Sequence, residues 1–278
     1  MGNMQTNQLK IAFIGGGNMA SALIDRILDG ALTPQEVLVI EPADAARNAL
    51  QTRGITVHAL AHPDLTACDV WVLAVKPQAM REVCAQIAPF LSSDKLVISI
   101  AAGLPLATIA PWLNQHAKLA RAMPNTPAKV GLGMTGLFAL PGCDGNDISA
   151  VQSLFETAGQ TMWLADESML DAITAISGSG PGYVFYFMEA MERAALDLGF
   201  HPDEARNLAV STFQGAAALA AGSPDALAVL RERVTSKGGT TYAALSHMQN
   251  AGVDASIVQA LKAAEARAKE LAQQLSKA

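Results

Sequence analysis

The amino-acid sequence predicts an α/β domain with a doubly wound, mostly parallel sheet, followed by an all-helical domain. Two observations carry this prediction. Short apolar runs alternate with helical patterns up to about residue 165, and only helical periodicity remains after Ala165. Strand–helix alternation is typical of a parallel sheet with helices on both faces. We expect the two domains at residues 1–165 and 166–278.

The predicted strands are continuous apolar runs, which is typical of strands with both faces covered. They lie at 11–14, 37–40, 70–75, 96–100, 119–123, 133–140 and 160–164. Helical segments such as Met19–Leu28 and Asp44–Arg53 lie between them. The order predicts right-handed βαβ units within one sheet.

The second part has the periodicity of packed helices. From Tyr183 onward apolar residues recur at helical spacing, and a last stripe runs from Ile257 to Leu275 in steps of three and four. The uncharged stretch Asn207–Gly222 is shorter than a membrane span and contains polar side chains. We interpret it as a helix buried on several sides, as in an oligomer interface.

The composition also predicts self-association. Hydrophobic residues make up 51% of the chain and charged residues only 16%, against roughly 25% charged residues in ordinary domains. A chain with so little charge cannot easily cover its own surface. We therefore expect at least a dimer, in which part of that surface is buried.

Charge, cysteines and the first apolar run exclude several function classes. The net charge is −6 without a basic stripe, so we expect no nucleic-acid partner. Cys68, Cys84 and Cys143 lack metal-ligand spacing, so we expect reduced thiols in a cytoplasmic protein and no metal site. The run "IAFIGGG" is too short for a signal peptide, and no membrane segment is expected.

A glycine triplet follows the first predicted strand and opens a helix. This arrangement matches the G-x-G-x-x-G/A fingerprint of a Rossmann domain that binds NAD(P). Its exposed N–H groups and the positive end of the helix dipole would hold the phosphates. The predicted cofactor residues of this turn are Gly15, Gly16, Gly17, Asn18, Met19 and Ala20.

Glu41 ends the second predicted strand. A carboxylate at this place accepts hydrogen bonds from the adenosine ribose and repels a 2′-phosphate, which favours NADH over NADPH. Arg47, one turn into the next helix, is interpreted as a solvated surface arginine, with attraction of a phosphate as the alternative.

Two further loops follow predicted strands and should line the groove for the nicotinamide half of the cofactor, because ligands lie beyond the carboxyl ends of parallel strands. Their predicted cofactor residues are Ala74, Val75, Lys76, Pro77, Ala101 and Ala102. A surface lysine before a helix-breaking proline is the alternative interpretation of Lys76.

The reactive side chains favour an imine substrate. The five histidines are scattered without catalytic spacing, and no lysine lies between Lys129 and Lys237. Reduction of a ketone requires a proton donor for the oxygen. Reduction of a protonated imine requires only a hydride, so positioning and charge complementarity can suffice.

Five segments together resemble the pyrroline-5-carboxylate reductase family, whose members catalyse the last step of proline biosynthesis. The segments are "IAFIGGGNMASALI", "LAVKPQ", "RAMPNTPAKVGLG", "ITAISGSGPGYVF" and "VTSKGGTTYAAL", in the order of the family. The resemblance implies reduction of Δ1-pyrroline-5-carboxylate to L-proline with NADPH or NADH. It also implies an obligate dimer, or an oligomer of dimers, with the active site at the subunit interface.

The resemblance also implies roles for individual residues. The hydroxyl of Thr241 would lie near the ring nitrogen of the substrate and serve catalysis. The substrate carboxylate would be held by Ser236, Gly238, Gly239 and Thr240 together with Thr241.

Two further residues have a family role and a structural alternative. Glu167 would lie near the imino group, with a helix-start glutamate as the alternative. Asn125 would border the nicotinamide, and a structural turn between Pro124 and Pro127 competes with that role.

The chain departs from the family pattern at two positions. Lys237 stands where many members have proline, and it would either strengthen carboxylate binding or point into solvent. NADPH-preferring members commonly have a small or hydroxyl residue where Glu41 stands, so the family favours NADPH and Glu41 favours NADH.

Two other functions compete with this one. A β-hydroxyacid dehydrogenase-like reductase would use a lysine on the first helix of the second domain, and the lysine-free interval 130–236 argues against it. A non-catalytic dinucleotide-sensing protein would bind cofactor without turnover, and it gives no reason for Thr240 and Thr241 at a helix start.

Overall fold

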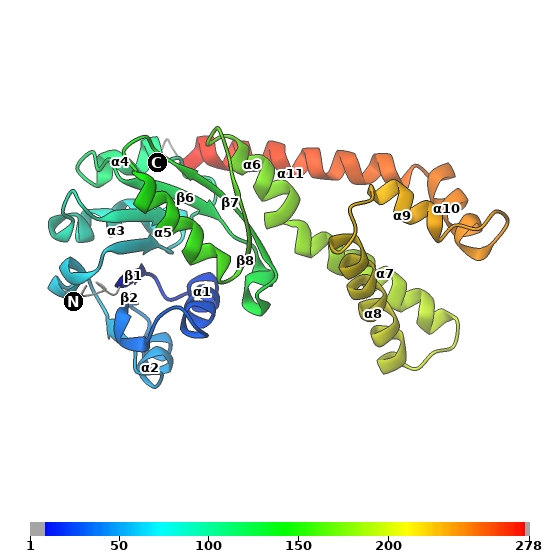
Figure 1. Ribbon diagram of the computed structural model, residues 1–278, viewed down its shortest axis with the longest axis horizontal. Coiled ribbons are helices and arrows are strands. Elements are labelled where there is room, and N and C mark those ends of the chain that lie inside the picture. Colours follow the sequence, from blue (N-terminus) through cyan, green and yellow to red (C-terminus); the bar gives the residue numbers. More distant parts are fainter. Residues whose placement is uncertain (1–8, 276–278) are drawn as a thin grey trace, which may run out of the picture. The chain divides into compact units, whose positions relative to one another are not determined.

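The computed structural model describes residues 9–275 (Figure 1). The strands are β1 (Ile11–Ile14), β2 (Val37–Ile40), β3 (Thr56–His58), β4 (Val70–Leu73), β5 (Leu96–Ser99), β6 (Leu119–Met123), β7 (Gly133–Ala139) and β8 (Gly159–Trp163). The helices of the first part are α1 (Asn18–Leu28), α2 (Asp44–Gln51), α3 (Met80–Ile87), α4 (Leu106–Trp112), α5 (Gly145–Glu156) and α6 (Met169–Ile173). The later helices are α7 (Gly180–Asp197), α8 (Pro202–Ala221), α9 (Leu227–Arg233), α10 (Thr240–Asn250) and α11 (Val253–Leu275).

The eight strands form one sheet in the order β3-β2-β1-β4-β5-β6-β7-β8. All neighbours pair in parallel except β6 and β7, which are antiparallel. Reversal of strand order beside β1 is the doubly wound arrangement, so the predicted fold class is confirmed. β3 is not among the predicted strands, because it has only three residues and one buried side chain.

Alternate side chains of each central strand enter two different cores. Ile11 and Phe13 of β1 pack with α1, α2 and α5 on one face of the sheet. Ala12 and Ile14 pack with α3 and α4 on the other face. Both faces are therefore apolar, and this explains why the strands are continuous rather than alternating in hydrophobicity.

The parallel strands are paired so that their carboxyl ends meet at one edge. Ile14 pairs with Ile40 of β2 and with Leu73 of β4, and Leu73 pairs with Ser99 of β5. The loops after these strands consequently leave the sheet side by side.

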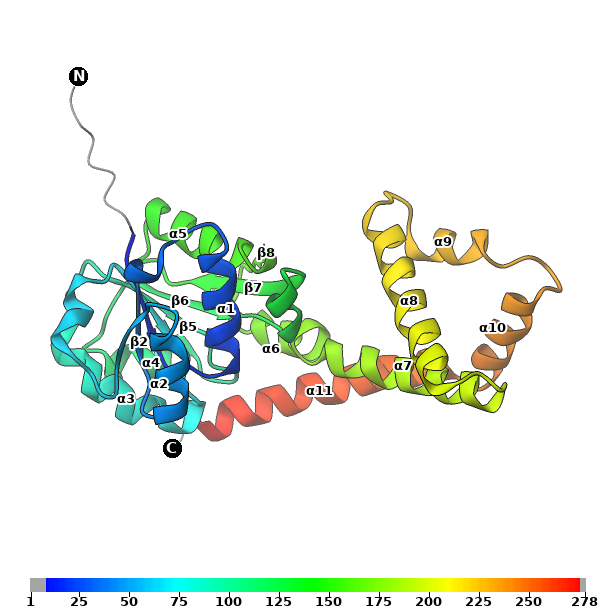
Figure 2. The same ribbon diagram turned by 90° about the horizontal axis from the view of Figure 1, so that it is seen from below.

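Two compact units make up the described chain: residues 9–179 with 264–275, and residues 180–263. We name them the nucleotide unit and the helical unit. The division differs from the predicted boundary at residue 165 because α6 contacts β6 and β7, and because the last turns of α11 lie beside the nucleotide unit (Figure 2). The functional boundary at residue 165 stays a prediction.

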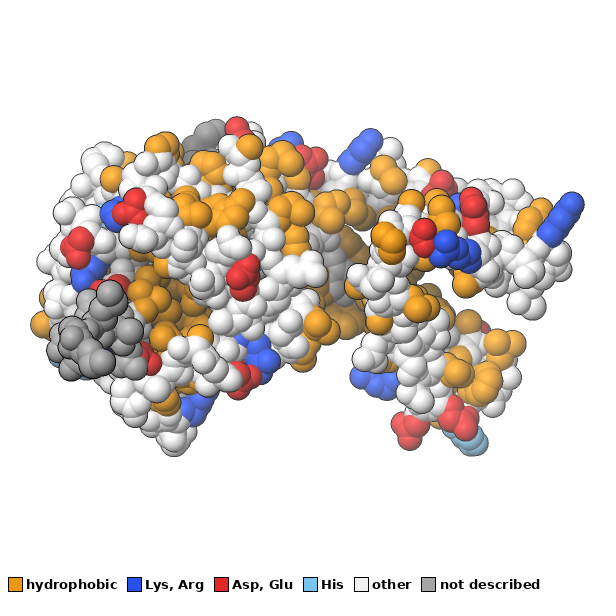
Figure 3. All heavy atoms as spheres, in the orientation of Figure 1, with side chains coloured by type: hydrophobic (Ala, Val, Ile, Leu, Met, Phe, Trp, Pro, Cys, Tyr) orange, Lys and Arg blue, Asp and Glu red, His pale blue; other side chains and the backbone are white. Residues whose placement is uncertain are grey.

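The helical unit has few buried side chains. α7 and α8 pack against each other, and the fully buried residues are small: Ala195, Ala205 and Ala209. Large hydrophobic side chains reach its surface (Figure 3), among them Phe185, Tyr186, Leu208, Leu219, Leu227, Tyr242, Met248, Ile257 and Val258. Between residues 9 and 275, no helix is long and apolar enough to cross a membrane.

Candidate active site

The first glycine of the turn after β1 has no room for a side chain. Gly15 has φ +107°, and a Cβ atom there would lie 2.8 Å from the carbonyl oxygen of Ala74. Its N–H donates to the carbonyl of Ile40 over 2.8 Å. Both the backbone angle and the close approach of the loop after β4 therefore require glycine at this position.

The third glycine faces open space at the start of α1. Gly17 is the N-cap residue without a side-chain cap, and a Cβ atom on it would meet nothing within 4 Å. Gly17 and Asn18 are exposed, Met19 is half-buried and Ala20 is buried against the sheet. The first N–H groups of α1 have no partner within the helix. The turn fits a dinucleotide pyrophosphate, which needs this close backbone approach.

Glu41 connects the glycine turn to the start of α2. Its Oε2 accepts the N–H of Gly16 and its Oε1 accepts the N–H of Ala43, each over 2.8 Å. Arg47 donates to the carbonyls of Glu41 and Pro42 and pairs with Asp44. The guanidinium is thus tied to local acceptors, in contrast to the solvated arginine that the sequence analysis expected.

The loops after β4 and β5 leave the same edge of the sheet. The N–H of Ala74 donates to Ile14 over 2.8 Å, and the N–H of Ile100 donates to Leu73 over 3.1 Å. Lys76 and Ala102 are exposed, whereas Ala101 is buried. Val75 and Pro77 are half-buried. The structure therefore brings the predicted cofactor residues of the first five strands to one edge.

Asn125 follows β6 and is only 7% exposed. Its Nδ2 donates to the carbonyl of Ser177 and its Oδ1 accepts the N–H of Met134, each over 3.0 Å. The amide thus joins β6 to β7 and to the π-helical turn Thr174–Gly178. These contacts support a structural role for Asn125 in the turn between Pro124 and Pro127. Contact of Asn125 with a nicotinamide stays a prediction.

Glu167 precedes α6 and binds two groups of the nucleotide unit. Its Oε1 accepts the N–H of Leu106 over 2.8 Å and pairs with Arg121 Nη1 over 3.0 Å. Arg121 lies on β6 and is 3% exposed. The carboxylate therefore does more than begin a helix. Its partners, Leu106 and Arg121, belong to the nucleotide unit.

The glycine–threonine segment belongs to the helical unit. Gly238 has φ +73°, and Gly239 is the N-cap of α10, so Thr240 and Thr241 begin a helix as expected. The N–H of Gly239 donates to the carbonyl of Ser236 over 2.9 Å. Lys237 and Thr240 are exposed and Thr241 is half-buried. Within residues 9–275 no hydrogen bond occupies the threonine hydroxyls.

A group of potential metal ligands, which the sequence did not reveal, begins at the last residue of β3 and continues after it. Asp64 Oδ2 lies 2.8 Å from His58 Nε2 and 3.2 Å from His62 Nδ1, and the hydrogen bond to His58 is the main reason that the pKa of Asp64 is lowered. The spacing His-x-x-x-His-x-Asp was the available signal. The two imidazole rings are stacked with their centroids 3.8 Å apart, and one ligand atom of each of the three residues lies within 4.8 Å of the others.

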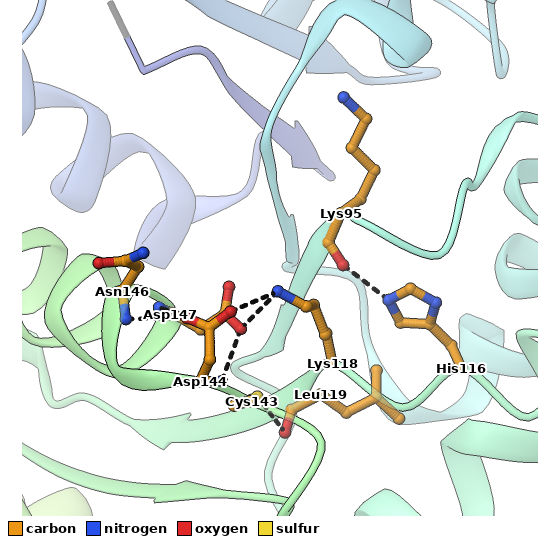
Figure 4. Close-up of polar contacts among 8 residues, drawn as sticks. All are labelled: Lys95, His116, Lys118, Leu119, Cys143, Asp144, Asn146 and Asp147. Atoms are coloured by element: carbon orange, nitrogen blue, oxygen red, sulfur yellow. Dashed lines mark hydrogen bonds and ion pairs between the residues drawn. The ribbon is translucent and has the colours of Figure 1, made fainter. Parts of the chain in front are cut away.

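A second polar cluster serves the fold at the opposite edge of the sheet (Figure 4). Lys118, just before β6, lies 3.0 Å from Asp144 and 2.9 Å from Asp147, and these bonds raise its pKa. Asp144 caps α5. His116 Nε2 donates to the carbonyl of Lys95 over 2.7 Å and is buried. These groups lie at the amino end of β6 and are not part of the candidate site.

The three thiols are free, and burial is the first cause that raises the pKa of each. The pKa is about 11 for Cys68, about 12 for Cys84 and about 11 for Cys143. Thiols in this state are poor nucleophiles at neutral pH.

Two family models match the two parts of the chain. Residues 10–103 match a model described as NADP oxidoreductase, coenzyme F420-dependent. Residues 167–271 match a model described as pyrroline-5-carboxylate reductase dimerisation.

Curated relatives and solved structures extend over nearly the whole chain. A pyrroline-5-carboxylate reductase of Pseudomonas aeruginosa is 41% identical, covering 96% of this chain and 98% of its own. The solved pyrroline-5-carboxylate reductase of Coxiella burnetii has 35% identity and a TM-score of 0.89, covering 95% and 99% of the two chains. A pyrroline carboxylate reductase of Plasmodium falciparum with NADP bound has 28% identity and a TM-score of 0.85, covering 95% and 98%.

Proposed function

The chain belongs to the pyrroline-5-carboxylate reductase family, and on this premise we propose that it reduces Δ1-pyrroline-5-carboxylate to L-proline with a hydride from a nicotinamide dinucleotide. The observation that carries the proposal is 41% identity to a reductase of this name over 96% of the chain. The enzyme thus belongs to proline biosynthesis, and its free thiols are consistent with a cytoplasmic location.

We propose that residues 1–165 hold the cofactor. The support is the turn at Gly15 and Gly17, where one glycine leaves no space for Cβ and the other faces open space at the helix start. The proposed cofactor residues are Gly15, Gly16, Gly17, Asn18, Met19, Ala20, Glu41, Ala74, Val75, Lys76, Pro77, Ala101, Ala102 and Asn125. For Asn125 the proposed role is indirect, because its amide is used within the protein.

Residues 166–278 are proposed to hold the substrate. The carboxylate would accept the N–H groups of Gly238 and Thr240 at the start of α10, with Ser236 at the rim, while the N–H of Gly239 donates to Ser236 and shapes the turn. The positive end of the helix dipole favours an anion there. Lys237, exposed beside this start, adds a positive charge that a proline would not supply.

The chemistry requires little of the protein beyond orientation. When bound, the nicotinamide supplies the hydride, which goes to the imine carbon of the ring, while the ring nitrogen keeps its proton and becomes the amine of proline. Thr241 is proposed to hold that N–H through its hydroxyl, which no group of the described chain occupies. A separate acid is unnecessary because the substrate enters protonated.

We propose a preference for NADH over NADPH. The carboxylate of Glu41 is fixed by the amides of Gly16 and Ala43 beside the glycine turn. A 2′-phosphate at this end of the cofactor would meet its negative charge. Arg47 does not offset this effect, since Asp44 and two carbonyls already engage its guanidinium.

We propose a homodimer as the smallest assembly. α7 and α11 line an apolar groove of about 330 Å³ in the helical unit, with Tyr183, Tyr186, Phe187, Val253, Ile257 and Leu261 among its residues. The matched dimerisation model covers the same helices. A second copy of this unit would remove these side chains from water.

An assay with both cofactors tests the function. The purified chain should oxidise NADH, and NADPH more slowly, when Δ1-pyrroline-5-carboxylate is added, and L-proline should accumulate in equal amount. Binding of a dinucleotide without turnover would instead support the sensing protein, and the proposed reductase activity would be wrong.

A further inference from the structure

We infer that Arg121 and Glu167 form a positioning pair that fixes the loop Ala101–Pro105 and, through it, the nicotinamide. The inference rests on the proposed function, because this loop is the proposed wall of the nicotinamide site. It replaces the expected contact of Glu167 with the substrate by an indirect role in orienting the cofactor.

Arg121 is a charge inside the sheet and requires a partner. It lies on β6, pairs in register with Phe138 of β7 and is 3% exposed. Its Nη1 lies 3.0 Å from Oε1 of Glu167, whose side chain is 18% exposed. A buried guanidinium left without a carboxylate is strongly destabilised, so Arg121 holds Glu167 in one place.

Glu167 in turn holds the start of α4. Its Oε1 accepts the N–H of Leu106, which is 61 residues away in the chain. Pro105, the N-cap residue of α4, supplies no side-chain cap. Glu167 therefore takes the role of a cap from another element, and its negative charge suits the positive end of a helix.

The loop between β5 and α4 is consequently fixed at both ends and in the middle. At its start the N–H of Ile100 donates to Leu73, and at its end Leu106 is held by Glu167. In the middle, a Cβ on Gly103 would lie 3.4 Å from the backbone N of Ala272 in α11. Glu167 therefore supplies a polar side-chain contact at the far end of the loop.

Loss of this pair should change the rate more than the affinity. The phosphates are proposed to bind at Gly15–Ala20, after β1, and not at the loop after β5, so most of the cofactor contacts would remain. A nicotinamide displaced by about 1 Å can slow hydride transfer by about 10²-fold. We therefore expect an effect on kcat with little change in the dissociation constant of the dinucleotide.

Glu167→Ala tests the inference, with Asp166→Ala as the matched control. We expect kcat to fall about 10- to 100-fold, while KM for pyrroline-5-carboxylate and Kd for NADH each change less than about threefold. Asp166 is the neighbouring carboxylate and binds only the start of α6, at the N–H of Ser168. Its variant should behave as the unchanged protein.

Glu167→Gln serves if the alanine variant does not fold, since the amide oxygen can still accept from Leu106 and Arg121. We expect a smaller loss of kcat and faster hydrogen exchange at the Leu106 amide. A KM for pyrroline-5-carboxylate that rises about tenfold at unchanged kcat would show instead that Glu167 touches the substrate. Unchanged kcat and exchange in both variants would reject the positioning role.

Failure of the unaltered protein to reduce the substrate would reject the proposed function instead. Hydrogen exchange at the Leu106 amide would still test the Arg121–Glu167 pair in that case.

Discussion

The nucleotide unit and the helical unit bury their hydrophobic side chains to very different extents. In the nucleotide unit, Trp71, Phe13, Phe155 and many Ile and Leu side chains are fully buried on the two faces of the sheet. In the helical unit the buried residues are alanines, and large side chains such as Phe185 and Ile257 are exposed. The first unit contains its own core, whereas the second requires another surface to complete one.

The two units therefore differ in whether they need a second protein surface to bury their hydrophobic side chains. Burial of one Leu, Ile or Phe side chain contributes about 1.5–3 kcal/mol to stability. The exposed hydrophobic side chains of the helical unit can contribute this free energy only when they are buried on association.

Ile257→Glu should break the helical unit's association and give the largest effect. Ile257 lines the apolar groove, and a residue that dominates an interface contributes about 2 kcal/mol or more, so self-association should weaken about 30-fold or more. Light scattering after gel filtration measures the mass. Gln259→Glu adds the same charge on α11 outside the groove lining. An unchanged dimer in Ile257→Glu would place the interface elsewhere.

Thr241→Ala should lower kcat about 10²-fold, the usual effect of a lost donor or acceptor at the reacting group. Kd for the dinucleotide should stay the same, because Thr241 belongs to the helical unit. Thr241→Ser should keep most of the activity. Thr235, whose hydroxyl is bonded to the carbonyl of Arg231, provides Thr235→Ala as the control. An equal loss of cofactor affinity would contradict the division of roles between the units.

Glu41→Ser should raise the ratio of kcat/KM for NADPH to that for NADH about tenfold, which corresponds to about 1.4 kcal/mol of removed repulsion. Glu41 belongs to the nucleotide unit and the proposed carboxylate-binding residues belong to the helical unit, so KM for pyrroline-5-carboxylate should not change. Glu82→Ser, on the exposed side of α3, controls for loss of a negative charge. The same ratio in Glu41→Ser and the unaltered protein would mean that Glu41 faces away from the ribose.

Titration of Cys84, in the core of the nucleotide unit, should have the smallest effect of these changes, on the pH dependence of the free energy of unfolding. Its pKa is about 12 in the fold and about 8.5 in an unfolded chain. Because the folded pKa is raised, the stabilisation is complete below about pH 8.5 and is lost as the pH rises towards 12. From about pH 8 to pH 9 the free energy of unfolding should fall by no more than about 1 kcal/mol from this thiol. Urea unfolding of Cys84→Ser should lack this part of the slope, and an equal slope would show that the thiol is not shielded.

Local patterns in the sequence were sufficient for most of the sheet and for the glycine turn. β1, β2 and β6 have the predicted bounds because each is a continuous apolar run between turn signals. The helix start at Thr240 was also predicted, because the preceding glycines end one helix and open another. The sequence predicted β4 two residues too long, since Ala74 and Val75 are apolar but belong to the loop beside Gly15.

Contacts between distant residues could not be predicted in the same way. The bond from Leu106 to Glu167 spans 61 residues, and no local pattern records it. Asn125 is similar, because its partners Met134 and Ser177 belong to a strand and to a π-helical turn. The histidines at 58 and 62 were treated as scattered although they lie four residues apart, because β3 itself was not recognised.

The return of α11 to the nucleotide unit has a consequence for the order in which the protein is made. Residues 264–275 pack beside Gly103, about 170 residues after the loop that they cover. At a synthesis rate of about 5–20 residues per second, the sheet emerges from the ribosome many seconds before this cover. The loop after β5, which is the proposed wall of the dinucleotide site, therefore passes through a stage in which it is exposed, and residues 264–275 cover it later.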